Sequence, residues 1–315
     1  MNATIGTTLK GRYQIIADLK RRAFGKTYRA IRLAPGEHTP LPQGGGGGQG
    51  GEGLPSPLEC AIRRCPPPCA DPLIWGSAKQ RFELERSIQS QLGEHPQIPS
   101  IIEGFQENQE LCVVREYIPG QSLEPEMKQP WSPDRVITML QEVLTILDFA
   151  HQCGVIHGNI TPANLIRRSW DSKIVLIDFA RIKEIETIVL SPVGVAKTSA
   201  VGTPGYMPIE QLDGKPAYGS DIYALGITAI QALTGVSPRQ LGREPKTGQV
   251  IWHHLAPVPE DLMAILDQMV RADISGRYQS AAAVLHDLAG LAPITGGLQG
   301  AYQSFDVVFV APVGG

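Results

Sequence analysis

The stretch from Val155 to Ala180 limits the possible folds of this chain more than any other part of the sequence. It reads VIHGNITPANLIRRSWDSKIVLIDFA. Pro162 stops a helix from starting early, and the β-branched run Lys173–Ile177 predicts a short buried strand. The polar residues at the two ends of the stretch are His157, Asn159, Asn164 and Asp178. The stretch is therefore interpreted as a loop, a short turn and a buried strand.

The order and spacing of these residues resemble the catalytic loop and metal-binding turn of the protein kinase family, which read H-R-D-L-x-x-x-N and D-F-G. The resemblance implies a bilobal α+β fold, with a small antiparallel sheet lobe that holds one helix and a mainly helical second lobe. It also implies structural roles for His157 and Phe179. Asn164 and Asp178 supply oxygen atoms, which Mg²⁺ prefers, so they are the expected metal ligands.

Several positions in this stretch differ from the family where its chemistry takes place. The Arg-Asp pair of the family is Gly158-Asn159 here, and its catalytic-loop lysine is Thr161. The last glycine of the metal-binding turn is Ala180. An amide cannot accept and carry a proton as a carboxylate does, so Asn159 and Thr161 occupy the catalytic positions without the usual catalytic groups. The chain looks like a kinase whose general base has been removed.

The segment Leu19–Tyr28 aligns with the glycine-rich loop of the family, G-x-G-x-x-G, whose backbone closes over nucleotide phosphates. Its first two glycines are replaced by Lys20 and Arg22, and Gly25 is retained. The two long cations either obstruct ATP or contact its phosphates; the alternative is a solvated basic hairpin tip. The segment 35–57 has nine glycines and five prolines and predicts a flexible insertion between two strands of the small lobe.

The segment Leu58–Cys65 resembles the V-A-I-K strand of the family, with Arg63 in place of the lysine that pairs with the α- and β-phosphates. The resemblance also places Ala61 beside the nucleotide. A helix is predicted over Ser77–Leu92, because helical spacing puts several side chains on one face: Phe82, Glu85, Gln89 and Leu92. A carboxylate on that face needs a cation, so we expect an ion pair between Arg63 and Glu85. The alternative is a solvated Glu85.

The segment Val113–Gly120 resembles the hinge that joins the two lobes. The resemblance places Glu116 and Tyr117 against the nucleotide, with Arg115 just before them at the back of the adenine pocket. A buried guanidinium there requires a carboxylate, for which Glu85 and Asp178 are the candidates. We expect such a pair to fill the pocket from behind and to weaken ATP binding.

The large lobe is predicted from several further segments. A helix runs from the N-cap pair Ser132-Pro133 to Gly154, with an apolar stripe between them. The segment Val201–Glu210 matches the end of the family's activation segment, and Ser220–Gly235 resembles its buried central helix. Two more helices are expected, over Asp261–Val270 and Ser280–Leu291.

The resemblance gives structural roles to three charged residues of this lobe. Asp221 is expected to hydrogen-bond the backbone of the catalytic loop, and Arg277 is expected to pair with Glu210. Such pairs argue for the fold and not for activity. The predicted boundaries are 13–118 for the small lobe, 119–291 for the large lobe and 292–315 for a C-terminal tail.

Composition argues against several classes of protein. With 315 residues and a net charge of -3 the chain has no basic excess, so nucleic-acid binding is not expected. No apolar run is long enough to span a membrane and the N-terminus has no signal-peptide pattern, so a cytoplasmic protein is expected. The five cysteines fit no common disulfide or zinc framework and predict reduced thiols.

Three functions remain open on this sequence. The first is a pseudokinase, a signalling or scaffolding module with weak or altered ATP binding and with protein partners. The second is a weak or atypical serine/threonine kinase, since phosphoryl transfer depends largely on positioning and electrostatics. The third is a structural partner subunit that binds no nucleotide. Loss of a general base typically lowers a rate by about 10²- to 10⁴-fold, which favours the first.

Overall fold

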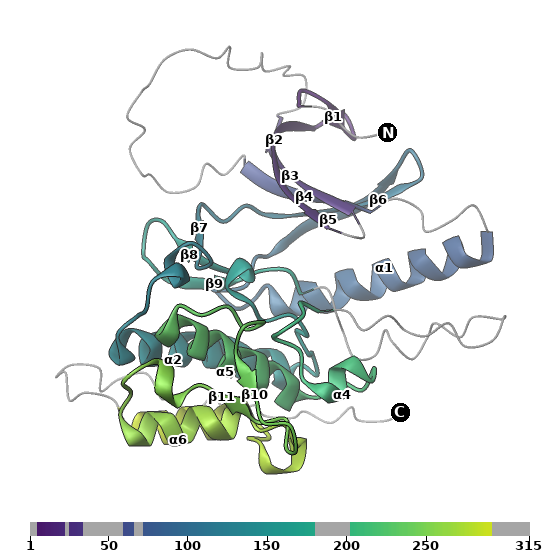
Figure 1. Cartoon of the computed structure of the whole chain (residues 1–315). Helices are drawn as coiled ribbons and strands as arrows, with labels where there is room; N and C mark the ends of the chain where they lie inside the picture. The colour runs from purple at the N-terminus through teal and green to yellow at the C-terminus, as the bar shows by residue number, and fades with distance from the viewer. Residues whose placement is uncertain (1–4, 23–24, 34–58, 66–71, 180–201, 292–315) are drawn as a thin grey trace, which may run out of the picture.

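The computed structural model describes residues 5–22, 25–33, 59–65, 72–179 and 202–291. Within these ranges the chain forms a small lobe on an antiparallel sheet and a larger, mainly helical lobe (Figure 1). The α+β class and the two-lobe architecture predicted from the sequence are confirmed. The predicted insertion at 35–57, the segment 180–201 and the tail at 292–315 lie outside the described residues.

The sheet of the small lobe has the strand order β1-β2-β3-β4-β6-β5, and every neighbouring pair is antiparallel. Its strands are β1 (Thr8–Leu9), β2 (Tyr13–Arg22), β3 (Gly25–Arg32), β4 (Glu59–Cys65), β5 (Ile101–Glu107) and β6 (Glu110–Glu116). The sheet starts earlier than the expected residue 13, because β1 pairs with β2 and buries Leu9. A two-residue strand is too short for hydrophobic periodicity to reveal.

Local sequence sets the register of the hairpin formed by β5 and β6. Asn108 and Gln109 at its tip both have positive φ, 49° and 63°. Two-residue turns of this hand match the right-handed twist of the strands, and asparagine tolerates the left-handed conformation well. The hairpin brings β6 between β4 and β5, so the chain leaves the sheet at Glu116 and passes into the large lobe.

Helix α1 (Pro72–Leu92) is the long helix of the small lobe. It starts at Pro72 and not at the predicted Ser77, because proline is well suited to the first helical position and the helix continues through Gly76. The predicted inward face is confirmed for three side chains that are buried: Phe82, Gln89 and Leu92. The side chain of Glu85 lies outside the described part of the structure, so its ion pair with Arg63 stays a prediction.

The helices of the large lobe include α2 (Pro133–Gln152), α4 (Ile209–Leu212), α5 (Tyr218–Thr234), α6 (Glu260–Met269) and α7 (Ala281–Ala289). The predicted caps of α2 are confirmed: Ser132 accepts a hydrogen bond from Arg135 N, and Gly154 follows the helix with a φ of 76°. The helices predicted over 261–270 and 280–291 are present as α6 and α7, with ends shifted by one or two residues.

Short strands and 3₁₀ turns connect these helices. Strands β7 (Gly120–Ser122), β8 (Leu165–Arg168) and β9 (Ile174–Leu176) form a small sheet, and β9 is a shorter version of the strand predicted over 173–177. The 3₁₀ turns are η1 (Glu126–Lys128), η2 (Pro162–Asn164), η3 (His253–Leu255) and η4 (Ile274–Gly276). A hairpin of β10 (Gly242–Arg243) and β11 (Val250–Ile251) follows α5 and was not predicted.

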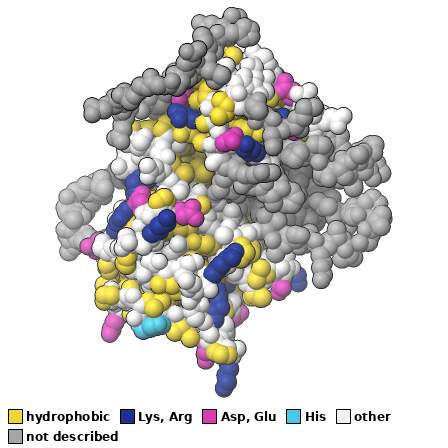
Figure 2. Space-filling model, turned by 45° about the horizontal axis from the view of Figure 1, so that its top comes forward, with side chains coloured by type: hydrophobic (Ala, Val, Ile, Leu, Met, Phe, Trp, Pro, Cys, Tyr) yellow, Lys and Arg dark blue, Asp and Glu magenta, His cyan; other side chains and the backbone are white. Residues whose placement is uncertain are grey.

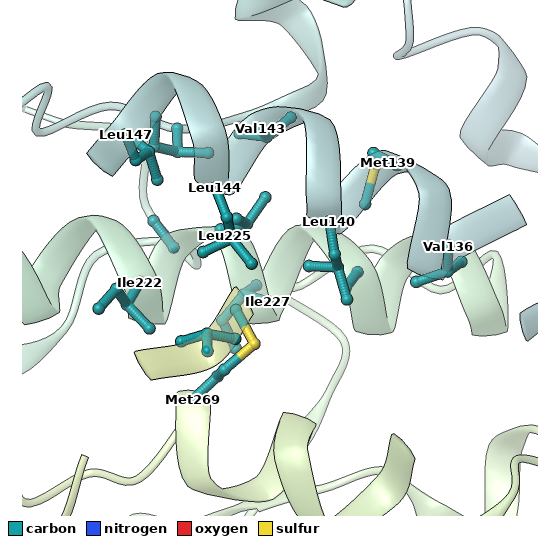
Figure 3. Close-up of a cluster of buried hydrophobic side chains, with 14 of the residues drawn as sticks. Val136, Met139, Leu140, Val143, Leu144, Leu147, Ile222, Leu225, Ile227 and Met269 are labelled. Atoms are coloured by element: carbon teal, nitrogen blue, oxygen red, sulfur yellow. The ribbon is translucent and has the colours of Figure 1, made fainter. Parts of the chain in front are cut away.

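Packing of α2 against α5 forms the centre of the large-lobe core. Figure 3 shows Leu140 and Leu144 of α2 pointing toward Leu225 of α5, with Met269 of α6 close to Ile227 on the other side. Helix α5 is buried along almost its whole length, as expected of a helix that is apolar all round. It cannot move without disturbing this core, so a side chain on α5 is a fixed point for the loops around it.

The surface of the molecule mixes both signs of charge. On the face shown in Figure 2, basic and acidic side chains are interspersed between apolar ones. This agrees with the small net charge of -3. In the part of the chain that the structure describes, no helix is both long enough and apolar enough to cross a membrane.

Candidate active site

Asp221, in the first turn of α5, is the fixed point of the candidate site. Its carboxylate is fully buried and accepts hydrogen bonds from His157 N at 2.8 Å and Gly158 N at 2.7 Å. Nε2 of His151, from α2, lies 3.0 Å from the same carboxylate. A buried carboxylate is tolerated where such donors surround it. The bond predicted between Asp221 and the loop backbone is present, and it ties this loop to the central helix.

The His157 side chain joins the same loop to the residues that follow β9. Its Nδ1 accepts from Asn159 N at 3.2 Å, so the tautomer with the proton on Nε2 also satisfies the 3.1 Å contact to the Ile177 carbonyl. The imidazole packs edge-on against the Phe179 ring, with 4.7 Å between the ring centres. Both rings are buried. They therefore hold the loop and the turn against each other.

Asn159 is held in place by hydrogen bonds to its side chain and to its backbone. Its Oδ1 accepts from Thr203 Oγ1 at 2.9 Å, and its carbonyl accepts from Asn164 Nδ2 at 2.8 Å. Thr161, two residues further on, is 4% exposed and makes no side-chain cap at the start of η2. An amide and a hydroxyl carry no charge, and neither is a proton acceptor of carboxylate strength.

Asp178 follows β9 in an unusual backbone conformation. Its φ is 75°, in the left-handed region that few residues other than glycine adopt. Such conformations are found at functional sites, where the surrounding structure holds them. Ile177 N donates to the Asn164 carbonyl at 2.9 Å, so the two predicted metal ligands, Asn164 and Asp178, lie close together.

The donor set of this pair fits Mg²⁺. The ion is commonly bound by one or two carboxylates together with phosphate oxygens and water, and it does not require a cage made entirely of protein. Among the described residues there is no group of three or more His, Cys, Asp or Glu side chains that could hold a metal ion. A bound magnesium ion would therefore take Asp178 and Asn164 as its protein ligands and the rest from a nucleotide and water.

A cleft of about 440 Å³ lies between the two lobes next to this loop. Five of the residues predicted to contact a nucleotide line it: Ala61, Arg63, Arg115, Glu116 and Tyr117. Asp178 lines the same cleft. Ala61 of β4 lies directly opposite Arg115 of β6 in the sheet, so their side chains point to the same face. The volume suits a ligand of the size of a nucleoside.

The fold and this geometry agree with the family to which the motifs point. Residues 75–288 match the model of the protein kinase domain. This chain belongs to the protein kinase domain family. Serine/threonine-protein kinase B of Synechocystis sp. is 35% identical over 286 residues, which cover 89% of this chain and 46% of the relative. Serine/threonine-protein kinase C of the same organism is 38% identical over 287 residues, covering 90% of this chain and 50% of the relative.

The chain spans about half the length of these curated kinase relatives. Among solved structures, the Mycobacterium tuberculosis PknI kinase domain is similar with a TM-score of 0.64 and 22% identity, covering 92% of this chain and 100% of that chain. At this identity the likeness establishes the fold alone. The protein-kinase fold and the bacterial serine/threonine type of the family, both predicted from the motifs, are confirmed.

In this kinase domain α1 contacts the metal-binding turn through Gln89. The buried side-chain amide donates from Nε2 to the carbonyl oxygen of Phe179. Sequence reasoning placed Gln89 on the inward face of the helix but gave it no role. A polar residue within an otherwise apolar helical stripe is the signal that marks it, since such a group must find a partner when buried.

The kinase phosphate loop can be followed in part. Lys20 and Arg22 belong to β2, but their side chains lie outside the described part of the structure, so their contacts stay predictions. Gly25 has a φ of 119°, and a Cβ added there would lie 2.2 Å from the carbonyl oxygen of Arg64. Close approach of two strands therefore already requires glycine at this position, independently of any phosphate.

The end of the kinase activation segment is anchored to the large lobe. Arg277 is buried and its Nη1 lies 2.7 Å from Glu210, so the predicted ion pair is present. Gln211 donates from Nε2 to the Gly158 carbonyl at 2.6 Å. The bonds from Thr203 and Gln211 to the catalytic loop were not predicted. Thr203 lies within the motif segment Val201–Glu210 and Gln211 directly follows it, and the partners of both are far away in the sequence.

Two cysteines of the small lobe, Cys60 and Cys112, are buried free thiols. Burial raises the pKa of Cys60 and of Cys112 from the ordinary 9.0 to about 12, so both stay protonated near neutral pH. Thiols in this state are poor nucleophiles. Cys65 and Cys153 are also free, and Cys69 lies outside the described residues. For the described cysteines the prediction of reduced thiols is confirmed.

Proposed function

We propose that this protein is a catalytically impaired serine/threonine-kinase-like module that works in the cytoplasm as a signalling or scaffolding unit with protein partners. The observation that carries the proposal is Asn159. Its side-chain oxygen accepts a hydrogen bond from Thr203 at 2.9 Å. A held, neutral amide therefore stands where family members use a carboxylate to accept the proton of the substrate hydroxyl.

The expected loss of rate is large. Removing a general base costs about 10²- to 10⁴-fold. Thr161 also supplies no positive charge to the transferring phosphate, where the family uses a lysine. Effects at one site do not simply multiply, but each of these acts on the same step. Transfer to protein hydroxyl groups should therefore be close to background.

The cleft supports altered nucleotide binding. Arg63 and Arg115 both line it, and Asp178 and Asn164 fit a magnesium ion. When bound, that ion supplies positive charge to the phosphates. If Arg115 pairs with Asp178, that carboxylate is not available to the metal, and ATP affinity should be weak and almost independent of magnesium. It should also be lowered by salt, because contacts between exposed charges are screened. Calorimetric titration of ATP with and without magnesium measures this, and tight binding that strictly requires magnesium would contradict it.

A weak serine/threonine kinase is the second candidate. The hydrogen bonds that hold the catalytic loop in place favour it. Asp221 fixes the catalytic-loop backbone through bonds of 2.7 and 2.8 Å. Asn159 is held at the position where it can still orient a hydroxyl group. The relatives carry the name serine/threonine-protein kinase. A partner subunit without nucleotide, the third candidate, is distinguished by the absence of a thermal shift with ATP and magnesium.

Incorporation of labelled γ-phosphate from ATP into the protein or a generic substrate tests the proposal. We expect little or none. Asn159→Asp alone should not restore full activity, because Thr161 and Arg63 remain. Robust incorporation that is lost in Asp178→Ala would overturn the proposal. Asp213→Ala is the matched control, since Asp213 is an exposed carboxylate of the same lobe and should leave any transfer unchanged.

A further inference from the structure

Asn159 has one side-chain group that the contacts around it leave open. Its Oδ1 accepts the hydrogen bond from Thr203, and its carbonyl accepts from Asn164. In the part of the chain that the structure describes, no group accepts a hydrogen bond from Nδ2 of Asn159. We propose that this nitrogen binds the terminal phosphate of a nucleoside triphosphate, so that the cleft prefers ATP to ADP. The inference rests on the proposed nucleotide-binding role of the cleft and names the ligand that the site favours.

The hydrogen bond from Thr203 determines which end of the Asn159 amide is open. An asparagine side chain has one acceptor oxygen and an amino group with two donor hydrogens. Thr203 Oγ1 donates to the oxygen at 2.9 Å, so the amino group lies on the other side of the side chain. Asn159 is half-buried, and its amino group is reached by solvent. The loop therefore presents a donor where the family presents a carboxylate, which only accepts.

The backbone of Asn159 lies beside the predicted metal ligands. Its carbonyl accepts from Asn164 Nδ2 at 2.8 Å, and the carbonyl of Asn164 accepts from Ile177 N at 2.9 Å. Asp178 follows directly and lines the cleft together with Ala163. When the base lies against the hinge, as the family resemblance implies, the phosphates extend toward these residues. The terminal phosphate is therefore expected next to the loop that carries Asn159.

The neutral amide at position 159 also changes the electrostatics of this loop. Family members have an aspartate here and a lysine at the position of Thr161, and the two charges cancel. In this chain both side chains are neutral, and Thr161 is buried. A carboxylate repels a terminal phosphate, whereas an N–H group forms a charge-assisted hydrogen bond to it. The change that removes the proton acceptor therefore also supplies a phosphate ligand.

This contact can distinguish a triphosphate from a diphosphate. ADP lacks the terminal phosphate but keeps the base, the ribose and the other two phosphates of ATP. Arg63 lines the cleft at the family position that pairs with the α- and β-phosphates, which both nucleotides share. A change at Arg63 should therefore affect ATP and ADP alike, whereas a change at Asn159 should affect ATP alone.

Calorimetric titration of the whole chain with ATP and with ADP, in the absence of magnesium, tests the proposal. The unchanged protein is expected to bind ATP about tenfold more tightly than ADP, as one hydrogen bond to a charged group allows. Asn159→Ala should remove most of this difference by weakening ATP binding alone, and Asn159→Asp should weaken ATP binding further through repulsion. Thr203→Val leaves the amino group free to turn away and should reduce the difference in part.

Asn108→Asp is the matched control for Asn159→Asp. It makes the same chemical change at an exposed hairpin tip outside the cleft, where the φ of 49° also suits aspartate. It should leave the affinities for ATP and ADP unchanged. Arg63→Met should weaken the binding of both nucleotides and keep their ratio.

Equal or tighter binding of ADP by the unchanged protein would overturn the proposal, and so would an ATP preference that survives Asn159→Asp. Binding of neither nucleotide at millimolar concentration would also overturn it, while the proposed non-catalytic role would stand. Efficient phosphate transfer would remove that role, and the same titrations would still decide whether Asn159 binds the phosphate. If Asn159→Asp fails to fold by circular dichroism, Asn159→Ala and Thr203→Val provide the same test.

Discussion

The residues that hold the catalytic loop in place match the protein kinase family, whereas the residues at the positions for phosphoryl transfer differ from it. Asp221 holds the loop backbone and Arg277 pairs with Glu210, as the family resemblance predicts. At the transfer positions, neutral Asn159 and Thr161 stand where the family has charged groups. A fold requires that buried polar groups have partners, whereas catalysis requires a particular proton acceptor and charge. The first requirement can be met without the second.

The largest effect on stability is expected from Asp221→Ala. The change leaves the backbone N–H groups of His157 and Gly158 without their acceptor inside the lobe. We expect the free energy of unfolding to fall by about 4 kcal/mol, the cost typical of removing one partner from a buried charged network. Urea denaturation measures it. Asp221→Asn, which keeps one acceptor, should lower the free energy of unfolding by less. A decrease below about 1 kcal/mol for Asp221→Ala would show that Asp221 does not hold the catalytic loop as described.

A somewhat smaller effect is expected from Arg277→Met. Methionine keeps the bulk of the buried side chain but leaves Glu210 without the cation that lies 2.7 Å away. The expected loss is about 3 kcal/mol in the same urea experiment. Adding Glu210→Gln should cost less than the sum of the two single changes, because the two side chains interact directly. Additive losses would show that the pair contributes little as a pair.

Thr203→Val tests the link between the transfer positions and the activation segment. Valine keeps the shape and removes the hydroxyl that donates to Asn159 at 2.9 Å. We expect the free energy of unfolding, measured by urea denaturation, to fall by about 1 kcal/mol, the value typical of one hydrogen bond between neutral groups. Thr138→Val is the control, since its hydroxyl bonds the backbone of an exposed helical turn and should matter less. Equal losses at the two positions would show that the bond to Asn159 has no special weight.

The smallest effect is expected from phosphorylation of the activation segment. In many kinases the arginine next to the general base binds such a phosphate through two hydrogen bonds. Gly158 occupies that position and has no side chain. A phosphate on Ser191, Thr198 or Ser199, which lie outside the described residues, should therefore leave hydrogen exchange at 157–159 unchanged. Strong new protection there on phosphorylation would mean that another group replaces the arginine.

The parts of the fold that sequence could predict are those in which pattern and motif act over short distances. The periodicity and caps of α2 and the spacing around Asp178 are local signals. Strands β1 and β10 have two residues each and offer no periodicity. Helix α1 starts at Pro72, five residues before the predicted Ser77, because the apolar spacing used for the prediction begins only at Phe82.

The contacts that complete the site could not be predicted for a different reason. Gln89 and Phe179 are 90 positions apart, and Asn159 and Thr203 are 44 apart. Neither pair has a spacing that indicates contact, because the Gln89 contact forms only when the two lobes meet and the Thr203 contact forms only when the large lobe has folded. Motifs locate each residue along the chain, but they do not state which backbone carbonyl a buried amide will find.

The bond from Gln89 to the Phe179 carbonyl has a mechanical consequence. Apolar side chains allow a helix to slide or roll, because dispersion attraction depends little on direction. A hydrogen bond weakens steeply when its angle falls below about 120°, and a step of one residue turns a helix by about 100°. This bond therefore opposes rotation of helix α1 about its own axis where the helix contacts the large lobe. Rotation of α1 and movement of the turn that carries Asp178 are therefore coupled through this bond.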